Sequence, residues 1–177
     1  ASLEASTEGA CEDGACEPEH EVQASTDFAQ CARSGAKDCG TLPAIGATEW
    51  LNSLGEPHGT VTLVDFWSSS CVNCAREIPE VERIYEKYKD AGLVVIGVHS
   101  PQQAHEREAS VVSGAASRLG ITYPVALDPE LEAFKAYGAN AWPTHYLAGP
   151  DGQLRSMGRG TSGLEEQIRT CLLYTSP

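Results

Sequence analysis

Two cysteines, Cys71 and Cys74, stand between an apolar segment and an amphipathic one, and this arrangement restricts the possible folds more than any other feature. Residues 61–66 have the character of a buried strand, and apolar residues then recur at helical spacing, at Ile78, Val81, Ile84, Tyr85 and Tyr88. Cys71 is therefore predicted to start a helix. Unpaired N–H groups and the helix dipole favour an anion there, so we expect its thiol to ionise below the usual pKa of about 8.5. Cys74 lies within one turn, close enough to attack a mixed disulfide formed on Cys71.

A Cys-x-x-Cys pair can also be half of a zinc site, but here a strand precedes it, a helix follows it and no second pair exists. This context favours redox chemistry. The alternative function is a metal-binding or metallochaperone module, in which Cys71, Cys74 and a histidine hold copper or zinc. His99 and His145 lie in or beside apolar strand segments, which favours structural roles for both. A peroxiredoxin-type peroxidase is disfavoured because the chain lacks a Thr-x-x-Cys motif.

Charge and hydropathy exclude several classes of partner. The 177 residues allow one domain with extensions, and 12 Lys and Arg against 25 Asp and Glu give a net charge of −13. No basic run is present, which argues against nucleic acid or an anionic membrane surface as a partner. The longest apolar run, residues 93–98, is too short to span a bilayer. Because the chain begins with Ala1, we expect a processed form or an internal fragment, with any signal or anchor outside it.

Three regions follow from composition. Residues 1–40 are acidic, supply −7 of the net charge and are predicted to form a linker or extension that is poorly ordered or tied by disulfides. Four cysteines lie there, which allows three pairings or a second redox or metal loop: Cys11, Cys16, Cys31 and Cys39. Residues 41–170 are predicted to be the folded domain. Residues 171–177 are predicted to be a cloning or sequencing scar that contributes nothing to the fold.

The central region alternates between strand and helix patterns, which indicates an α/β unit. Strands are predicted at 61–66, 93–99, 125–127, 144–147 and 154–158. Helices are predicted from Cys71 to Gly92 and over 104–119, 130–137 and 164–170.

Several motifs in a fixed order resemble the thioredoxin superfamily: Val64-Asp65-Phe66-Trp67, the Cys-x-x-Cys pair, Pro79 and Trp142-Pro143-Thr144. Within 42–170, the segments 49–53, 70–74 and 92–101 are similar to the thioredoxin-like domain of the DipZ family, a relative of TlpA/ResA-type extracytoplasmic thioredoxins. The resemblance implies an α/β thioredoxin-like fold, with a central mixed β-sheet flanked by helices. Ser70 and Val72-Asn73 stand where cytosolic thioredoxin has Trp and Gly-Pro, which disfavours a general cytosolic role.

Asp65 lies within an apolar strand, where an ionised carboxylate is costly unless it is paired or protonated. Its position alone favours a side chain turned to solvent. The resemblance, in which a buried Asp occupies the matching place, instead implies a proton acceptor that helps Cys74 become the resolving thiolate.

The resemblance also implies a substrate-binding edge. Most X-Pro bonds are trans, but a cis bond is implied before Pro143. It would aim the backbones of Trp142 and Thr144 at the cysteines, as an edge for an extended substrate peptide. Trp67, expected at the mouth of the site, is a further candidate for contact with the substrate, whereas Phe66 is expected in the core.

The predicted function is a thiol-disulfide oxidoreductase that acts on protein thiols and disulfides through a redox-active Cys71–Cys74 disulfide, with no further cofactor. No histidine lies between the cysteines to stabilise the thiolate strongly, which favours a reductase. The resemblance implies a place outside the cytosol, in the periplasm or on a tether facing it, and a CcdA-type membrane electron donor. The processes expected for such a reductase are cytochrome c biogenesis or disulfide repair.

Overall fold

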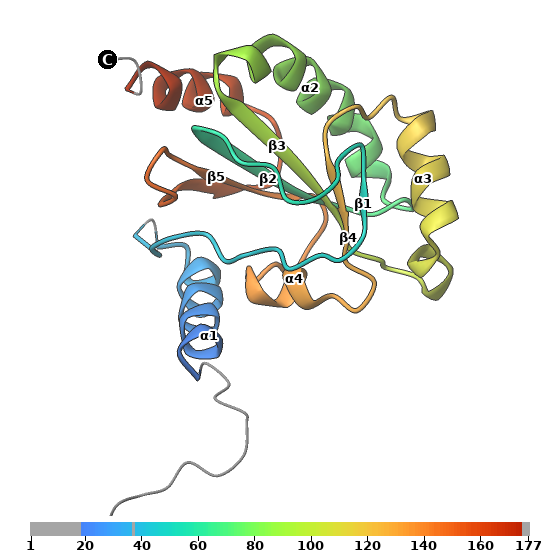
Figure 1. The fold of residues 1–177 in the computed structure, drawn as a ribbon, viewed down its shortest axis with the longest axis horizontal. Helices are drawn as coiled ribbons and strands as arrows, with labels where there is room; N and C mark the ends of the chain where they lie inside the picture. Colours follow the sequence, from blue (N-terminus) through green and yellow to red (C-terminus); the bar gives the residue numbers. More distant parts are fainter. Residues whose placement is uncertain (1–18, 37, 175–177) are drawn as a thin grey trace, which may run out of the picture.

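A six-stranded mixed β-sheet forms the centre of the protein in a computed structural model, which describes residues 19–36 and 38–174 (Figure 1). The strands are β1 (Trp50–Leu51), β2 (Val61–Trp67), β3 (Leu93–His99), β4 (Val125–Leu127), β5 (Thr144–Ala148) and β6 (Leu154–Gly158). Their order in the sheet is β1-β4-β3-β2-β5-β6. β2, β3 and β4 run parallel, whereas β1 pairs antiparallel with β4, and β5 pairs antiparallel with both β2 and β6. The predicted mixed sheet flanked by helices is confirmed.

Helices cover both faces of this sheet (Figure 1). They are α1 (Glu19–Ser34), α2 (Val72–Tyr88), α3 (Ala109–Arg118), α4 (Glu132–Ala136) and α5 (Leu164–Leu173). One core cluster joins the sheet to α2, α3 and α5, and a second joins it to α1 and α4. Successive side chains of β2 point to opposite faces of the sheet. Leu63 and Trp67 therefore belong to the first cluster, and Val64 and Phe66 belong to the second.

The predicted elements differ from the observed ones mainly where a turn interrupts a helical pattern. Every predicted strand is present within one residue at each end, but β1 was not predicted because two residues show no alternation. The helix predicted over 104–119 is divided into a 3₁₀ turn (Ala104–Arg107) and α3 by Glu108, whose backbone is extended at φ −72° and ψ 123°. The helix predicted over 130–137 begins later, since Leu131 has a positive φ of 62°.

The prediction that residues 1–40 join no core is wrong for their second half. α1 buries Phe28, Ala29 and Ala32. The Phe28 ring lies with its centroid 5.8 Å from that of Tyr137 and 6.3 Å from that of Tyr146. A few apolar residues on one face are enough to dock this helix, although they leave the segment's overall composition acidic.

Two local features hold α1 in place. Cys31 and Cys39 form a disulfide that ties the end of α1 to the chain before β1, whereas Cys11 and Cys16 lie outside the described residues. A Cβ atom at Gly138 would lie 2.4 Å from the carbonyl oxygen of Ala29, and the backbone there has a φ of +69°. Only glycine therefore allows the chain after α4 to approach α1 so closely.

The prediction that residues 171–177 lie outside the fold is wrong for residues 171–173. α5 continues through Thr170 to Leu173, and Leu164, Ile168 and Leu172 recur every fourth residue on its buried face. Cys171, beside that face, carries a free thiol. Residues 175–177 lie outside the described residues.

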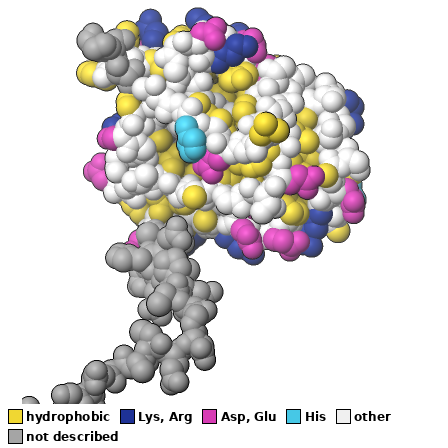
Figure 2. Space-filling model, viewed as in Figure 1, with side chains coloured by type: hydrophobic (Ala, Val, Ile, Leu, Met, Phe, Trp, Pro, Cys, Tyr) yellow, Lys and Arg dark blue, Asp and Glu magenta, His cyan; other side chains and the backbone are white. Residues whose placement is uncertain are grey.

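Charged side chains on the face shown in Figure 2 are of both signs; most lie towards its edge, but an acidic side chain lies beside the histidine near the middle, among hydrophobic side chains. Arg83 and Lys87 of α2 both bind Glu165 of α5, and these exposed ion pairs link the two helices above the sheet. Exposed pairs of this kind contribute little to stability, so we attribute the packing of α5 mainly to its apolar face.

Replacing Phe28 by Ala should lower the free energy of unfolding by about 3 kcal/mol, because it removes a buried aromatic ring from the second core cluster. Thermal unfolding followed by circular dichroism measures the change. Asp27→Ala, at an exposed position on the same helix, is the matched control and should change stability by less than about 0.5 kcal/mol. Equal stability of F28A and the wild type would show that α1 is not docked on the sheet in solution.

Candidate active site

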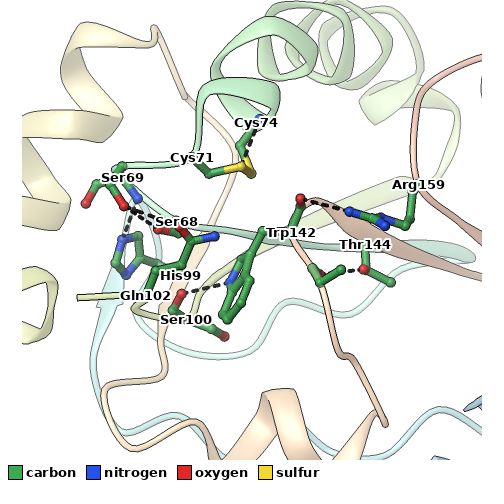
Figure 3. The surroundings of a disulfide bond; sticks show 12 residues. Ser68, Ser69, Cys71, Cys74, His99, Ser100, Gln102, Trp142, Thr144 and Arg159 are labelled. Carbon is green, nitrogen blue, oxygen red and sulfur yellow. Dashed lines mark hydrogen bonds between the residues drawn. A yellow bond between two sulfur atoms is a disulfide. The ribbon is translucent and has the colours of Figure 1, made fainter. Parts of the chain in front are cut away.

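The two cysteines lie at the junction between β2 and α2 and are joined by a disulfide (Figure 3). Cys71 is the N-cap of α2, with an extended backbone at φ −81° and ψ 109°. Its Sγ accepts a hydrogen bond from the backbone N–H of Cys74 at 3.1 Å. The sulfur thus takes the place of the side-chain oxygen that usually satisfies an unpaired N–H at a helix start. The predicted position of Cys71 is confirmed, and the helix end favours its thiolate once the disulfide is reduced.

The two sulfurs differ in accessibility. Cys71 is 9% exposed, whereas Cys74 is 1% exposed and packs in the first core cluster. Val72, between them, is exposed, so the start of α2 lies at the surface. An incoming group therefore reaches the sulfur of Cys71 before that of Cys74.

The turn before Cys71 is held by groups from β3 and from the segment that follows it. The backbone N–H of Ser69 donates to Nε2 of His99 at 3.1 Å, and the hydroxyl of Ser69 donates to Glu106 at 2.6 Å. Burial lowers the pKa of His99 to about 4, so its ring is neutral at pH 7 and can accept this bond. His99 is thus a structural histidine with a satisfied ring nitrogen. Figure 3 shows Ser68, Ser69, His99 and Gln102 gathered beside Cys71.

Asp65 is 4% exposed, and its place on β2 turns it towards the face of the sheet that α2 and Cys74 cover. A side chain turned to solvent is therefore excluded. Burial, with a smaller contribution from the negative charge of Glu77, raises the pKa of Asp65 to about 8. The carboxyl is mostly protonated at neutral pH, and it can gain or lose a proton in the pH range where thiols also ionise.

The loop before β5 faces the disulfide. The Trp142–Pro143 peptide bond is cis, as the resemblance implies. The indole N–H of Trp142 donates to the carbonyl of Ser100 at 2.9 Å, and its ring stacks on Phe134 with centroids 4.4 Å apart. The hydroxyl of Thr144 donates to the carbonyl of Ala141 at 2.7 Å, within the loop. The contacts of Trp142 attach the loop to the end of β3 and to α4, and the bond from Thr144 closes a turn within it.

The prediction that Trp67 contacts the substrate at the mouth of the site is wrong. Trp67 is 0% exposed, and its ring packs edge-on against His99 with centroids 4.8 Å apart. The alternation along β2 explains the error, because Trp67 faces the same covered side of the sheet as Leu63. Trp67 therefore supports the turn before Cys71 from beneath. Phe66 is buried in the second core cluster, as predicted.

Sequence reasoning missed Glu106 and Arg159. Glu106 accepts a hydrogen bond from the hydroxyl of Ser69 in the turn before Cys71. Arg159 donates to the carbonyl of Trp142 at 3.5 Å (Figure 3). The one signal for Glu106 is its place three residues after Gln103, the spacing of a helix capping box. Nothing in the sequence indicates Arg159, because it reaches the site only when β6 pairs with β5.

Within residues 19–36 and 38–174, no group of three or more His, Cys, Asp or Glu side chains is arranged to hold a metal ion. The metal-binding alternative needs a third ligand beside the cysteines, and His99 beneath the turn already uses Nε2 to accept from Ser69. The helices of this described part are all too short or too polar to cross a bilayer.

Comparison with known proteins identifies a matching family and several relatives of this chain. A profile of the AhpC/TSA family matches residues 42–157. The chain is 39% identical over 158 residues to the protein DipZ of Mycobacterium bovis, an alignment that covers 82% of this chain and 23% of DipZ. It is 31% identical over 140 residues to the thiol-disulfide oxidoreductase YkuV of Bacillus subtilis, which covers 73% of this chain and 92% of YkuV. The chain thus spans about a quarter of the length of DipZ and nearly all of YkuV.

A solved structure of a thioredoxin-like protein in its oxidized form superposes with a TM-score of 0.69 at 27% identity, and covers 77% of this chain and 97% of that protein. The predicted thioredoxin-like fold and the resemblance to DipZ are both confirmed.

The raised pKa of Asp65 predicts an unusual dependence of stability on pH. The folded protein keeps a proton on Asp65 up to about pH 8, whereas the unfolded chain releases it near the ordinary pKa of 3.8. The folded state therefore loses stability as pH rises between these values, by up to about 1.4 kcal/mol per pH unit. Asp65→Asn removes this loss, so its melting temperature should exceed that of the wild type at pH 8, and the difference should vanish near pH 4.

Melting temperatures of both proteins between pH 4 and pH 9, in about one-unit steps, test this prediction. Asp90→Asn, at an exposed position, is the control and should follow the wild type at every pH. Parallel curves for D65N and the wild type would mean that Asp65 is ionised in the folded protein.

Proposed function

Because the chain belongs to the AhpC/TSA family of thioredoxin-like proteins, we propose that it is a thiol-disulfide oxidoreductase that exchanges disulfides with protein substrates through Cys71 and Cys74. One observation carries the proposal: Cys71 caps the start of α2 while Cys74 lies in the first turn of the same helix, already joined to it by a disulfide. A nucleophile stabilised by the helix end and a resolving thiol one turn away are what disulfide exchange needs.

The reaction proceeds in two balanced steps. The thiolate of Cys71 attacks one sulfur of a substrate disulfide, and the other substrate sulfur leaves as a thiolate that takes up a proton. Cys74 then loses its proton and attacks the sulfur of Cys71, which releases the second substrate thiolate and forms the Cys71–Cys74 disulfide. Two electrons pass to the substrate, and an external dithiol must return two electrons to the pair before the next turnover.

Asp65 is the proton acceptor for Cys74 in this scheme. Its buried carboxyl faces the side of the sheet that α2 covers, and its pKa of about 8 makes proton exchange with a thiol nearly balanced. A carboxyl with the ordinary pKa of 3.8 would be a much weaker base for this step. The second step therefore accelerates as Asp65 ionises.

The loop that contains the cis Trp142–Pro143 bond receives the substrate. Its backbone lies opposite the cysteines, where an extended peptide can add hydrogen bonds along Trp142, Pro143 and Thr144 (Figure 3). Trp142 is partly exposed beside the site, so its ring offers an apolar surface to the residues that flank the substrate cysteine. Pro143 has no N–H, so its backbone can only accept a hydrogen bond from the substrate.

We infer that the protein works as a reductase. Neither residue between the cysteines, Val72 or Asn73, carries a positive charge that would strongly stabilise the Cys71 thiolate, and strongly oxidising pairs depend on such stabilisation. Redox equilibration with glutathione tests this direction. A potential near about −120 mV, the range of strong oxidants, would contradict it.

The setting that fits this chemistry is outside the cytosol, where protein disulfides form and need repair. The Cys31–Cys39 disulfide, distant in sequence from the redox pair, is in keeping with an oxidising compartment. We propose a periplasmic or membrane-tethered place, a CcdA-type membrane protein as electron donor, and cytochrome c maturation or disulfide repair as the process served.

Replacing Cys74 by Ser should trap substrates on Cys71, because the mixed disulfide then has no resolving thiolate beside it. Incubation with a protein disulfide such as insulin, followed by non-reducing electrophoresis, should show adducts that reductant removes. Cys71→Ser is the matched control and should trap nothing. Cys171→Ser removes the free thiol of α5 and should leave the trapping by C74S unchanged. Adducts through Cys74 in the C71S variant would reverse the assigned roles.

A further inference from the structure

Glu106 is a buried carboxylate beside the redox pair with no part in the reaction described above. It lies in the 3₁₀ turn after β3 and is 0% exposed. Its two oxygens accept five hydrogen bonds of 2.6 to 2.8 Å, from the hydroxyls of Ser68 and Ser69 and the backbone N–H groups of Ser70, Gln102 and Gln103. One side chain therefore joins the turn before Cys71 to the segment after β3.

This set of donors keeps Glu106 ionised. Burial by itself raises the pKa of a carboxyl, but hydrogen bonds from Ser69, Ser68 and the backbone N–H groups of Gln103 and Gln102 outweigh it and lower the pKa to about 2. No lysine or arginine is among its hydrogen-bonding partners. Glu106 is thus a permanent negative charge held by dipoles.

The charge lies close to Cys71. Oε1 of Glu106 is 2.7 Å from the backbone nitrogen of Ser70, the residue that directly precedes Cys71. Standard bond lengths then limit the separation between this oxygen and the Cys71 sulfur to roughly 10 Å. The buried side of the site gives little screening by solvent over that distance.

The other ionisable groups around the disulfide do not cancel this charge. His99 beneath the turn is neutral at pH 7, and Asp65 on β2 is mostly protonated. Burial raises the pKa of Glu77 on α2, and the positive charge of Arg159, an exposed residue after β6, lowers it in part. The start of α2 favours the Cys71 thiolate, and Glu106 is the fully buried, ionised group beside the turn that opposes it.

We propose that Glu106 is a positioning residue that holds the turn before Cys71 and, through its buried charge, makes Cys71 a weaker acid than the helix start alone would make it. This inference rests on the proposed function, because it explains how the redox potential of the Cys71–Cys74 pair is kept low enough for a reductase. Destabilising the Cys71 thiolate favours the disulfide form of the pair, and a pair that favours its disulfide form gives electrons away.

The expected size follows from Coulomb's law. A charge about 10 Å away shifts the pKa of a thiol by roughly 0.3 unit at the dielectric constant of water and by roughly 1 unit at the value suited to a protein surface. A tenfold stabilisation of the reduced form corresponds to about 30 mV for this two-electron couple.

Glu106→Gln tests the proposal in the full chain, since it removes the charge and keeps the shape. The rate of iodoacetamide alkylation at Cys71, mapped by mass spectrometry as a function of pH, gives the thiol pKa. We expect this pKa to fall by about 0.3 to 1 unit in E106Q, and the potential of the pair, equilibrated with glutathione, to rise by up to about 30 mV.

Ser69→Ala separates charge from geometry. S69A removes one hydrogen-bond donor to Glu106 and loosens the same turn. The carboxylate charge is then less offset by donor dipoles, so the pKa of Cys71 should rise, whereas in E106Q it should fall. Glu82→Gln is the control, because Glu82 similarly accepts hydrogen bonds from the backbone N–H and the hydroxyl of Thr122. It lies eight residues after Cys74, about 12 Å further along α2, and should not move the pKa of Cys71.

An unchanged or higher pKa of Cys71 in folded E106Q would overturn the proposal, and so would a fall in both E106Q and S69A, which would point to loop geometry alone. If E106Q does not fold, the S69A variant tests the proposal by itself. A higher pKa of Cys71 in S69A supports the proposal, and a lower or unchanged pKa overturns it. These outcomes are distinct from failure of the proposed function, in which the wild-type pair would not exchange with glutathione or insulin at all.

Discussion

The parallel pairing of β2 with β3 determines where the groups of the site lie. The two strands are in register from Val61 opposite Leu93 to Trp67 opposite His99, so they end together at one edge of the sheet. The pairing extends one step further, because the N–H of Ser100 donates to the carbonyl of Trp67 at 3.0 Å. The turn that carries Cys71 leaves from this edge, and the chain after β3 leaves beside it.

Several contacts of the site follow from this shared edge. His99 ends β3 directly below the turn and accepts from Ser69, while the next residues of the same chain carry Glu106 to the turn from the side. The carbonyl of Ser100 anchors the indole of Trp142, which brings the loop before β5 to the other side of the disulfide. Loss of register between β2 and β3 would therefore displace the supports of Cys71 and the loop before β5 together.

Burial has opposite consequences for the two carboxyls near this edge. Asp65 faces an apolar core without hydrogen bonds that hold its charge, and its pKa rises to about 8. Glu106 is equally hidden from solvent, but the serine hydroxyls and backbone N–H groups stabilise its ionised form and its pKa falls to about 2. One fold thus holds a mostly protonated carboxyl and a permanently ionised one near the same pair of cysteines.

Local patterns in the sequence determined the order of strands and helices, the helix start at Cys71 and the redox character of the pair, because all three depend on residues close together in the chain. Tertiary structure alone decided which side of the sheet Asp65 and Trp67 face, that α1 joins the core through Phe28, and that Glu106 reaches the turn before Cys71. These depend on strand pairing and helix docking between segments distant in sequence. A strand shows its period of two in the sequence, but which face is covered, and by which helix, is set only when the sheet has assembled.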